Sequence, residues 1–309
     1  MTQLSGTGSI PGKVFLLGEY AVLMGLPCVA VALGPRFQAR YVSGGSLGEI
    51  HPESPAGKLL AWSEKTVSPE VRQKALKDLT FEDPLKGAGG FGASTAQFAL
   101  VYQALGSHAG WELSWSAAWK LYRELTRKET ELKSPSGADL VSQWRGGVTW
   151  FNPSALVADD LFTCADFSGL MIFSATGQAG RKVATHTHLD SLNAKDWQRT
   201  LEPITQAGVR AIRAGQLSGL GQAMSDYAQA LHGLGLEIPS TTADRHALVS
   251  LPGVLGVKGA GAMQADAVLV LVDPAAGAEA REQIQKVAES RGLRLACNGL
   301  SQVEGLKWE

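Results

Sequence analysis

The stretch Gly87-Ala-Gly-Gly-Phe-Gly-Ala-Ser94-Thr-Ala-Gln-Phe-Ala-Leu-Val-Tyr-Gln-Ala-Leu105 places four glycines within six residues directly before an apolar run. In that run, apolar side chains recur at i, i+3, i+4 and i+7, the spacing of a helix buried along one face. Free N–H groups and the positive end of the helix dipole gather at a helix N-terminus, and glycines let a polyphosphate approach the backbone. The pattern predicts a phosphate-binding loop, in which the Ser94 hydroxyl either caps the helix or reaches a metal ion.

Two other interpretations of these glycines stay open. Gly87-x-Gly89-x-x-Gly92, with Glu112 about 20 residues further on, has the form of a dinucleotide-binding fingerprint. That fingerprint should follow a buried strand, whereas the preceding residues 80–86 are polar and contain Pro84. The second alternative is a glycine-rich turn that only begins a core helix.

Composition restricts the class of protein. The 309 residues, 45% hydrophobic and 18% charged, are enough for a large core and for two domains. A net charge of −1 provides no general attraction for nucleic acid or membrane, so we expect a small-molecule partner held by local groups. No apolar stretch approaches 18 residues and no signal-like N-terminus is present, which favours the cytoplasm. Three widely spaced cysteines, Cys28, Cys164 and Cys297, predict reduced core thiols.

Charged residues flank the first predicted strand. Short apolar runs at 14–17 and 28–33 predict two strands covered on both faces, and a further strand is expected at 37–42. Lys13 and Glu19 bracket the first of them. Charged groups beside a buried strand need a partner or a role, although a surface lysine and glutamate at the strand ends is the simpler alternative.

A second helix start lies at Ser136-Gly-Ala-Asp139. This spacing, before an apolar run, is typical of a capping box. A carboxylate in the first turn of a helix is also kept anionic by the helix dipole and can accept a proton from a neighbouring hydroxyl. Both interpretations of Asp139 stay open at this stage.

The remaining patterns predict an α/β (α+β) protein. Residues 53–86, which are polar and contain prolines, predict an excursion over the surface with one short helix near 71–79. The composition changes past residue 160, and the element order there suggests a compact α+β unit. The elements expected in the rest of the chain are helices at 111–132, 196–214, 217–231 and 279–291, and strands at 170–173, 183–188 and 267–272, with a glycine turn at 253–266.

Three glycine-bearing motifs together resemble the signature of the GHMP kinases, the superfamily of galactokinase, homoserine kinase, mevalonate kinase and phosphomevalonate kinase. They are Pro11-Gly-Lys-Val-Phe-Leu-Leu-Gly-Glu-Tyr-Ala-Val22, Gly90-Phe-Gly-Ala-Ser-Thr-Ala96 and Lys258-Gly-Ala-Gly-Ala262. Within the family, Gly25-x-Pro27 and Pro135-Ser-Gly-x-Asp139 look most like mevalonate kinase, and Glu19-Tyr20 is closer to phosphomevalonate kinase.

The resemblance implies a two-domain fold. Residues 1–165 would form an N-terminal βαβ domain with a left-handed crossover, and residues 166–309 a ferredoxin-like C-terminal domain. It also implies ATP and Mg²⁺ as cofactors. The sequence does not decide the oligomeric state, for which a homodimer is one option.

The resemblance further implies a role for individual residues. Asp139 would take the proton of the substrate hydroxyl, and Lys13 would keep Asp139 anionic and stabilise charge on the transferred group. Ser94 would help to hold Mg²⁺. The ATP phosphates would lie on Gly90, Gly92, Ala93, Ser94 and Thr95. The substrate would contact Glu19, Tyr20, Ser136, Gly259 and Ala260.

Two departures from the family pattern leave alternatives open. Lys128 stands where mevalonate kinases carry a second Mg²⁺ ligand, and Glu124 or Glu129 could replace it. The third motif continues as Ala262-Met-Gln-Ala instead of further glycines. The leading hypothesis is a kinase of a small hydroxylated acid, mevalonate before phosphomevalonate, and the alternative is a catalytically silent nucleotide-binding member. Few cations lie near the expected site to bind a second phosphate: Lys133, Arg145, Arg181 and Lys182.

Overall fold

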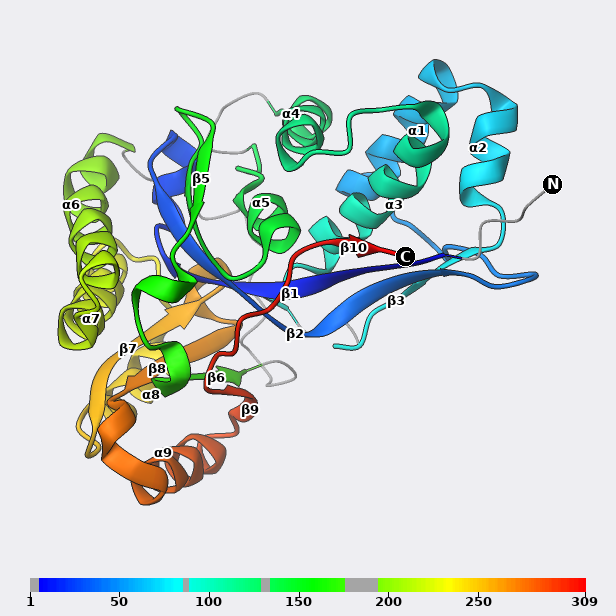
Figure 1. Cartoon of the computed structure of the whole chain (residues 1–309). Coiled ribbons are helices and arrows are strands. Elements are labelled where there is room, and N and C mark those ends of the chain that lie inside the picture. The colour runs from blue at the N-terminus through cyan, green and yellow to red at the C-terminus, as the bar shows by residue number, and fades with distance from the viewer. Residues whose placement is uncertain (1–5, 86–88, 129–133, 176–193) are drawn as a thin grey trace.

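The computed structural model describes residues 6–85, 89–128, 134–175 and 194–309, and these form two β-sheets with helices packed against them (Figure 1). The strand expected at 183–188 lies outside these ranges. None of the described helices combines the length and the apolar character that crossing a membrane requires. All three cysteines are free; Cys28 is buried, while Cys164 and Cys297 are partly exposed.

The first sheet is built on two long antiparallel strands, β1 (Thr7–Leu17) and β2 (Cys28–Tyr41). Its order is β10-β1-β2-β4-β5, and β3 also pairs with β2. The two strands expected at 28–33 and 37–42 are one continuous strand, because β1 pairs with β2 on both sides of Gly34 and Pro35. The remaining members are β3 (Leu79–Glu82), β4 (Val148–Asn152), β5 (Val157–Asp160) and β10 (Lys307–Trp308).

Helices cover one face of this sheet (Figure 1). They are α1 (Pro55–Thr66), α2 (Pro69–Leu76), α3 (Ala93–Ala109), α4 (Trp115–Thr126) and α5 (Ala138–Arg145). The surface excursion expected for residues 53–86 is therefore wrong in part. Ala56 and Leu59 of α1 are fully buried in the same core cluster as Phe98 and Leu105 of α3. The apolar side chains of this segment pack on α3, although its outer faces are polar.

The βαβ unit of this half consists of β3, the helices α3 to α5, and β4. β3 and β4 both pair antiparallel with β2, so they run in the same direction. They lie on one edge of β2, and β1 lies on the other edge. The left-handedness of the crossover stays a prediction from the resemblance, as does the division into domains at residue 165.

The second sheet has the ferredoxin-like arrangement that was expected. Chain order runs strand, helices, strand, strand, helix, strand, and the sheet order β7-β8-β6-β9 places the fourth strand beside the first. β8 is buried at every position, as its apolar run predicts. The strands are β6 (Leu170–Ser174), β7 (Val254–Ala260), β8 (Ala267–Val272) and β9 (Arg294–Asn298). The helices are α6 (Ala194–Arg213), α7 (Leu217–Gly233), α8 (Pro239–Val249) and α9 (Gly277–Ser290).

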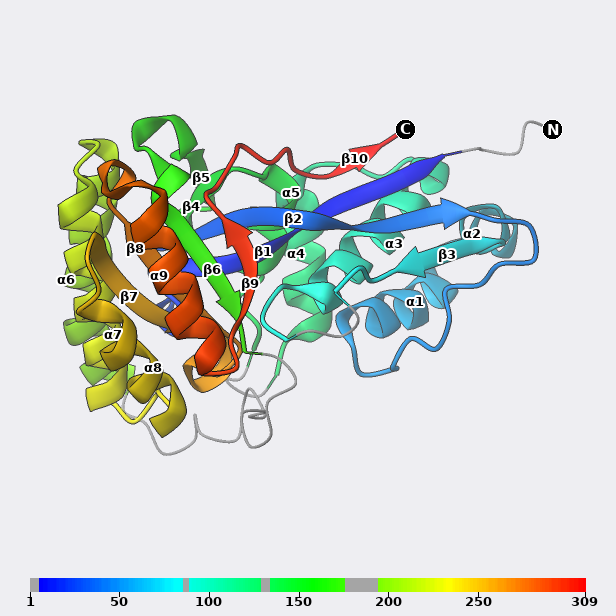
Figure 2. The ribbon, with the colours of Figure 1, turned by 90° about the horizontal axis from the view of Figure 1, so that it is seen from below.

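One core cluster joins the two halves of the chain. Leu16 of β1 and Val31 of β2 pack in the same cluster as Ile172 of β6 and Tyr227 of α7. The opposite face of the second sheet packs against α8 and α9, and α9 lies across it in Figure 2. The C-terminal segment then returns to the first sheet, where β10 pairs with the start of β1. The C-terminal end of β1, here called its inner end, therefore packs against residues from both halves of the chain.

Candidate active site

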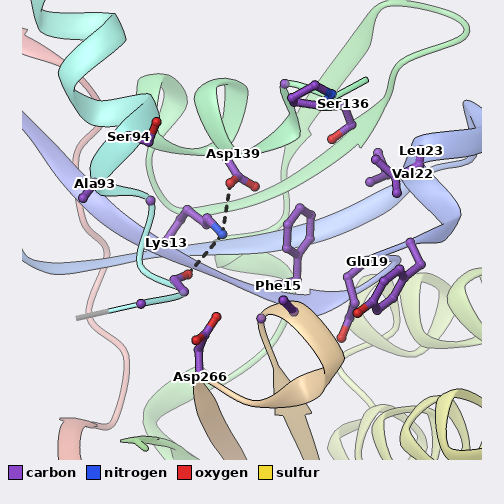
Figure 3. Close-up of a pocket in the computed structure, with 18 of the residues that line it drawn as sticks. Lys13, Phe15, Glu19, Val22, Leu23, Ala93, Ser94, Ser136, Asp139 and Asp266 are labelled. Carbon is purple, nitrogen blue, oxygen red and sulfur yellow. Dashed lines mark hydrogen bonds and ion pairs between the residues drawn. The ribbon is translucent and has the colours of Figure 1, made fainter. Parts of the chain in front are cut away.

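A cavity of about 460 Å³ lies where both sheets and two helix N-termini meet. Its wall is made by the inner end of β1, the glycine loop before α3, the turn before α5, and the connection from β7 to β8 (Figure 3). All three motifs singled out in the sequence contribute to it. Its charged lining residues are Lys13, Glu19, Asp139 and Asp266.

The glycine loop leads directly into α3, as the sequence predicts. Gly92 is the N-cap residue and has a φ of +87°, in the left-handed region that favours glycine. A side chain there would be tight, because a Cβ atom on Gly92 would lie 3.0 Å from the amide of Gln143. Packing against Gln143 is therefore one reason for this glycine, besides any phosphate contact.

A buried polar relay holds the loop in place. The Thr95 hydroxyl donates to the Gln143 side chain at 2.6 Å, and the Gln143 amide donates to the Pro11 carbonyl at 2.7 Å. Thr95 is buried and is not part of the cavity wall, whereas Gly90, Gly92, Ala93 and Ser94 are. Thr95 thus ties α3 to α5 and β1, and the other four residues of the expected phosphate loop face the cavity.

Lys13 and Asp139 form an ion pair at the centre of the cavity, with 3.2 Å between Nζ and Oδ2. Lys13 also donates to the Gly90 carbonyl at 3.1 Å, and its ammonium lies 4.9 Å from the centre of the Phe15 ring (Figure 3). The Lys13 side chain is 7% exposed and that of Asp139 is 32% exposed. The lysine is therefore held rigidly, and the carboxylate remains open to a ligand.

Asp139 does not close a capping box. The N-cap of α5 is Gly137, with a φ of +72°, and the Ser136 hydroxyl accepts a hydrogen bond from the Ala138 N–H at 3.2 Å. Asp139 lies in the first turn of the helix with its carboxylate on Lys13. Of the two interpretations left open by the sequence, the capping box is therefore not formed, and the role of Asp139 as a proton acceptor stays a prediction. Ser136 also lines the cavity.

Glu19 is anchored by the second half of the chain. It is buried and forms an ion pair with the fully buried Lys258 of β7, and the Gln264 amide donates to the same oxygen, Oε1, at 2.9 Å. Lys258 donates further to the carbonyls of Gly259 at 2.6 Å and Phe15 at 3.3 Å. Burial lowers the pKa of Lys258, and the charge of Glu19 opposes that shift. The second oxygen, Oε2, is buried without a hydrogen-bond partner among the described residues.

Tyr20 is tied to the altered third motif. Its hydroxyl accepts a hydrogen bond from the Met263 N–H at 2.6 Å, and its ring packs edge-on against Trp197. Burial raises the pKa of the Tyr20 hydroxyl. Tyr20 and Glu19 both line the cavity, and their contact with an acceptor stays a prediction.

The expected contacts of the third motif are displaced along the chain. Gly259 and Ala260 are buried within β7, and the next residues, Gly261 and Ala262, line the cavity instead. The tight connection puts Met263 and Gln264 at φ values of +51° and +58°. The Met263 N–H donates to Tyr20 and the Gln264 amide donates to Glu19, so these two residues hold Tyr20 and Glu19 at the cavity wall.

Several other expected residues are not on the cavity wall. Glu124 is exposed on α4, and Arg145 lies in the last turn of α5, away from Asp139 in the first turn. The remaining candidates lie outside the described residues: Glu129, Lys133, Arg181 and Lys182. Gly87 of the dinucleotide fingerprint does so too, and the strand before that loop, β3, pairs antiparallel in the sheet, unlike the strand of a dinucleotide-binding unit.

Asp266 is a wall residue that sequence reasoning missed. It follows the third motif directly and precedes β8, where it resembles any polar residue at the start of a strand. A single aspartate in that position carries no sequence signal, because the glycine loop against which it packs lies almost 180 residues earlier in the chain.

The oxygen donors of the cavity suit a Mg²⁺ ion that arrives with a nucleotide. Such ions usually keep several waters and bind one or two carboxylates together with phosphates. Ser94, Asp139 and Asp266 offer a hydroxyl and two carboxylates. In the described part of the chain, no group of three or more His, Cys, Asp or Glu residues is arranged to hold a metal ion by itself.

Comparison with known proteins identifies similar folds. No protein-family model and no curated protein matches the chain in sequence. Phosphomevalonate kinase of Streptococcus pneumoniae matches with a TM-score of 0.72 at 15% identity, over 96% of this chain and 99% of that chain. Mevalonate kinase of Methanococcus jannaschii matches with a TM-score of 0.69 at 16% identity, over 96% and 98%. Lactococcus lactis galactokinase, complexed with galactose, matches with a TM-score of 0.71 at 12% identity, over 98% and 96%.

Proposed function

Because the chain has the fold of the GHMP kinases, we propose that it is an ATP- and Mg²⁺-dependent kinase that phosphorylates a hydroxyl group of a small acid. The observation that carries this proposal is the ion pair of Lys13 and Asp139, at 3.2 Å, beside the N-terminus of α3. Phosphoryl transfer needs positioning and charge neutralisation more than covalent chemistry. A fixed ammonium next to an accessible carboxylate supplies both.

Each part of the cavity then has a task. The N–H groups at the start of α3, with Gly90, Gly92 and Ala93, receive the phosphates. Asp139 accepts the proton of the acceptor hydroxyl, and Lys13 stabilises the charge that develops on the transferred group. Ser94 would contribute its hydroxyl to Mg²⁺, which when bound neutralises phosphate charge. A solved complex of the S. pneumoniae enzyme contains phosphomevalonate and AMPPNP, an ATP analogue.

Mevalonate is the first candidate for the acceptor, and phosphomevalonate is the second. Phosphomevalonate carries an additional group of about −1.5 to −2 charge at neutral pH, and such groups usually require Arg or Lys donors. Among the described residues that line the cavity, Lys13 is the only lysine or arginine, and it is paired with Asp139. The charges therefore favour the acceptor with one acidic group.

The test is a screen of small hydroxylated acids, including both candidates, for ATP-dependent phosphorylation detected by mass spectrometry. We expect a product in the presence of Mg²⁺, with a higher kcat/KM for mevalonate than for phosphomevalonate. Asp139→Asn should lower kcat by about 10²-fold or more, because it removes the base and nearly preserves the side-chain volume. Glu124→Gln, on the exposed face of α4, is the matched control and should have no effect.

Two outcomes would contradict this proposal in different ways. Tight ATP binding without any product across the panel would favour a catalytically silent nucleotide-binding protein. Near-normal turnover in Asp139→Asn would remove the carboxylate from the chemistry. A clear preference for phosphomevalonate would leave the kinase assignment in place, but it would reverse the order of the two acceptors and replace the hydroxyl by a phosphate as the group that is phosphorylated.

A further inference from the structure

Asp266 lines the cavity and packs directly against the glycine loop. Figure 3 shows its carboxylate beyond Lys13, on the side away from Ser94 and Asp139. Asp266 belongs to the connection between the third motif and β8, and a backbone N–H of Ala262 donates to its carboxylate. Beyond counting Asp266 among the oxygen donors that suit Mg²⁺, the proposed reaction gives this carboxylate no role.

Three glycines from two loops make room for the Asp266 side chain. A Cβ atom on Gly89 would lie 2.7 Å from Oδ1, one on Gly90 would lie 2.6 Å from the Asp266 Cβ, and one on Gly261 would lie 2.0 Å from Oδ2. Real Cβ atoms do not approach other atoms this closely, so the backbone of both loops lies directly against the carboxylate. Part of the glycine pattern that predicts a phosphate loop therefore accommodates an aspartate.

In this position, the negative charge of Asp266 would repel a polyphosphate that binds to the glycine loop without a metal ion. The residues proposed to receive phosphates begin at Gly90, which Asp266 contacts. Among the described residues that line the cavity, Lys13 is the one lysine, and it is already paired with Asp139. Asp266 is half-buried, and buried charges are screened less by salt than exposed ones. Burial raises the pKa of Asp266, and the charge of Lys13 and the Ala262 N–H oppose that shift.

We propose that Asp266 makes nucleotide binding at this loop conditional on a divalent cation. Its negative charge repels a metal-free triphosphate and attracts the cation of a metal-bound one, so that the site selects the Mg²⁺ complex. This inference rests on the proposed function, since it requires a nucleotide on the glycine loop. It concerns charge at Asp266 and does not depend on whether the cation touches the carboxylate directly or through water.

The test measures ATP affinity by calorimetry with excess Mg²⁺ and again with EDTA, for the wild type and for Asp266→Asn. The amide keeps the size of the side chain and an oxygen that can accept from Ala262. We expect the variant to bind metal-free ATP about tenfold more tightly than the wild type does, and the tightening by Mg²⁺ to shrink by about the same factor. Asp226→Asn removes the same charge from an exposed position on α7 and should change neither value.

The possible results separate this inference from the proposed function. An equal Mg²⁺ effect in wild type and Asp266→Asn, or a loss of affinity by the same factor with and without Mg²⁺, would overturn the inference and assign Asp266 a purely structural role. If Asp266→Asn is unfolded by circular dichroism, Asp266→Ser provides the same comparison in a smaller side chain. A wild type that binds no nucleotide under either condition would instead contradict the proposed function.

Discussion

The buried ion pair of Glu19 and Lys258 allows a quantitative test of how the two halves of the chain hold the cavity. The pair links the end of β1 to β7, and its side chains are 7% and 0% exposed. Lys258→Met keeps an unbranched side chain, one atom shorter than lysine, and removes its charge. Glu19 would then retain only the Gln264 amide on Oε1, while Oε2 has no partner among the described residues. Leaving a buried charge uncompensated in this way typically costs about 3–5 kcal/mol of unfolding free energy.

The double variant Glu19→Gln with Lys258→Met decides whether that cost comes from the ion pair. It removes both charges, and exchanging a whole buried pair for neutral groups is often close to neutral. We therefore expect the double variant to be more stable than Lys258→Met alone, with a coupling free energy of at least about 2 kcal/mol. Urea unfolding would be followed by circular dichroism and by the fluorescence of the eight tryptophans.

An exposed pair provides the matched control. Arg213 and Asp159 lie 3.0 Å apart with about half of each side chain exposed, and such pairs contribute about 1 kcal/mol or less. Arg213→Met should therefore have a small effect. If Lys258→Met were no more destabilising than Arg213→Met, or if its cost remained in full in the double variant, the buried pair would not be what holds β1 to β7.

Two further predictions concern the glycine loop and its acidic neighbour. Gly92→Ala should weaken ATP binding and lower the melting temperature, because the new Cβ would lie 3.0 Å from Gln143 on a backbone with a φ of +87°. Gly233→Ala is the control, since a Cβ atom there would meet nothing within 4 Å. Equal effects of the two substitutions would contradict this reasoning. Burial raises the pKa of Asp266 above the ordinary carboxyl pKa of about 3.9. Between these two pKa values the folded protein binds more protons at Asp266 than the unfolded chain does, so the free energy of unfolding falls as the pH rises through this window and stays lower above it. Asp266→Asn should thus be more favourable for stability at pH 7 than at pH 4 in denaturant titrations, and a pH-independent difference would refute it.

The centre of the site could be predicted because its residues belong to short local patterns. Ser94 and Asp139 each lie in the first turn of a helix, and Lys13 lies on a strand next to a glycine. The partners of Glu19 and the position of Asp266 could not be predicted in this way. Lys258 is 239 residues from Glu19, and only the packing of β7 against β1 brings them together.

Two of the elements that were not predicted were missed for physical reasons that the structure makes plain. The glycines at 253–261 predict a turn, yet most of this segment is strand β7. Gly256 is needed there because a Cβ atom would lie 2.1 Å from the Gly221 carbonyl of α7, so these glycines permit a close approach of strand and helix. Helix α1 was missed because its region is polar overall; its signal is the cap Ser54 followed by a proline at the first helical position.

The altered third motif can be understood from the same contacts. A glycine at position 264 would leave the Glu19 carboxylate without the side-chain amide that donates at 2.9 Å. The backbone carbonyl of Gln264 accepts a hydrogen bond from the Thr241 hydroxyl at 2.8 Å. Both donors, Lys258 and Gln264, are directed at Oε1, and Oε2 is buried with no hydrogen-bond partner among the described residues. A buried carboxylate oxygen in that position requires a hydrogen-bond donor. Gln264 therefore supplies one of the two side-chain donors of the buried Glu19 carboxylate, and a glycine at this position would leave Lys258 as the other.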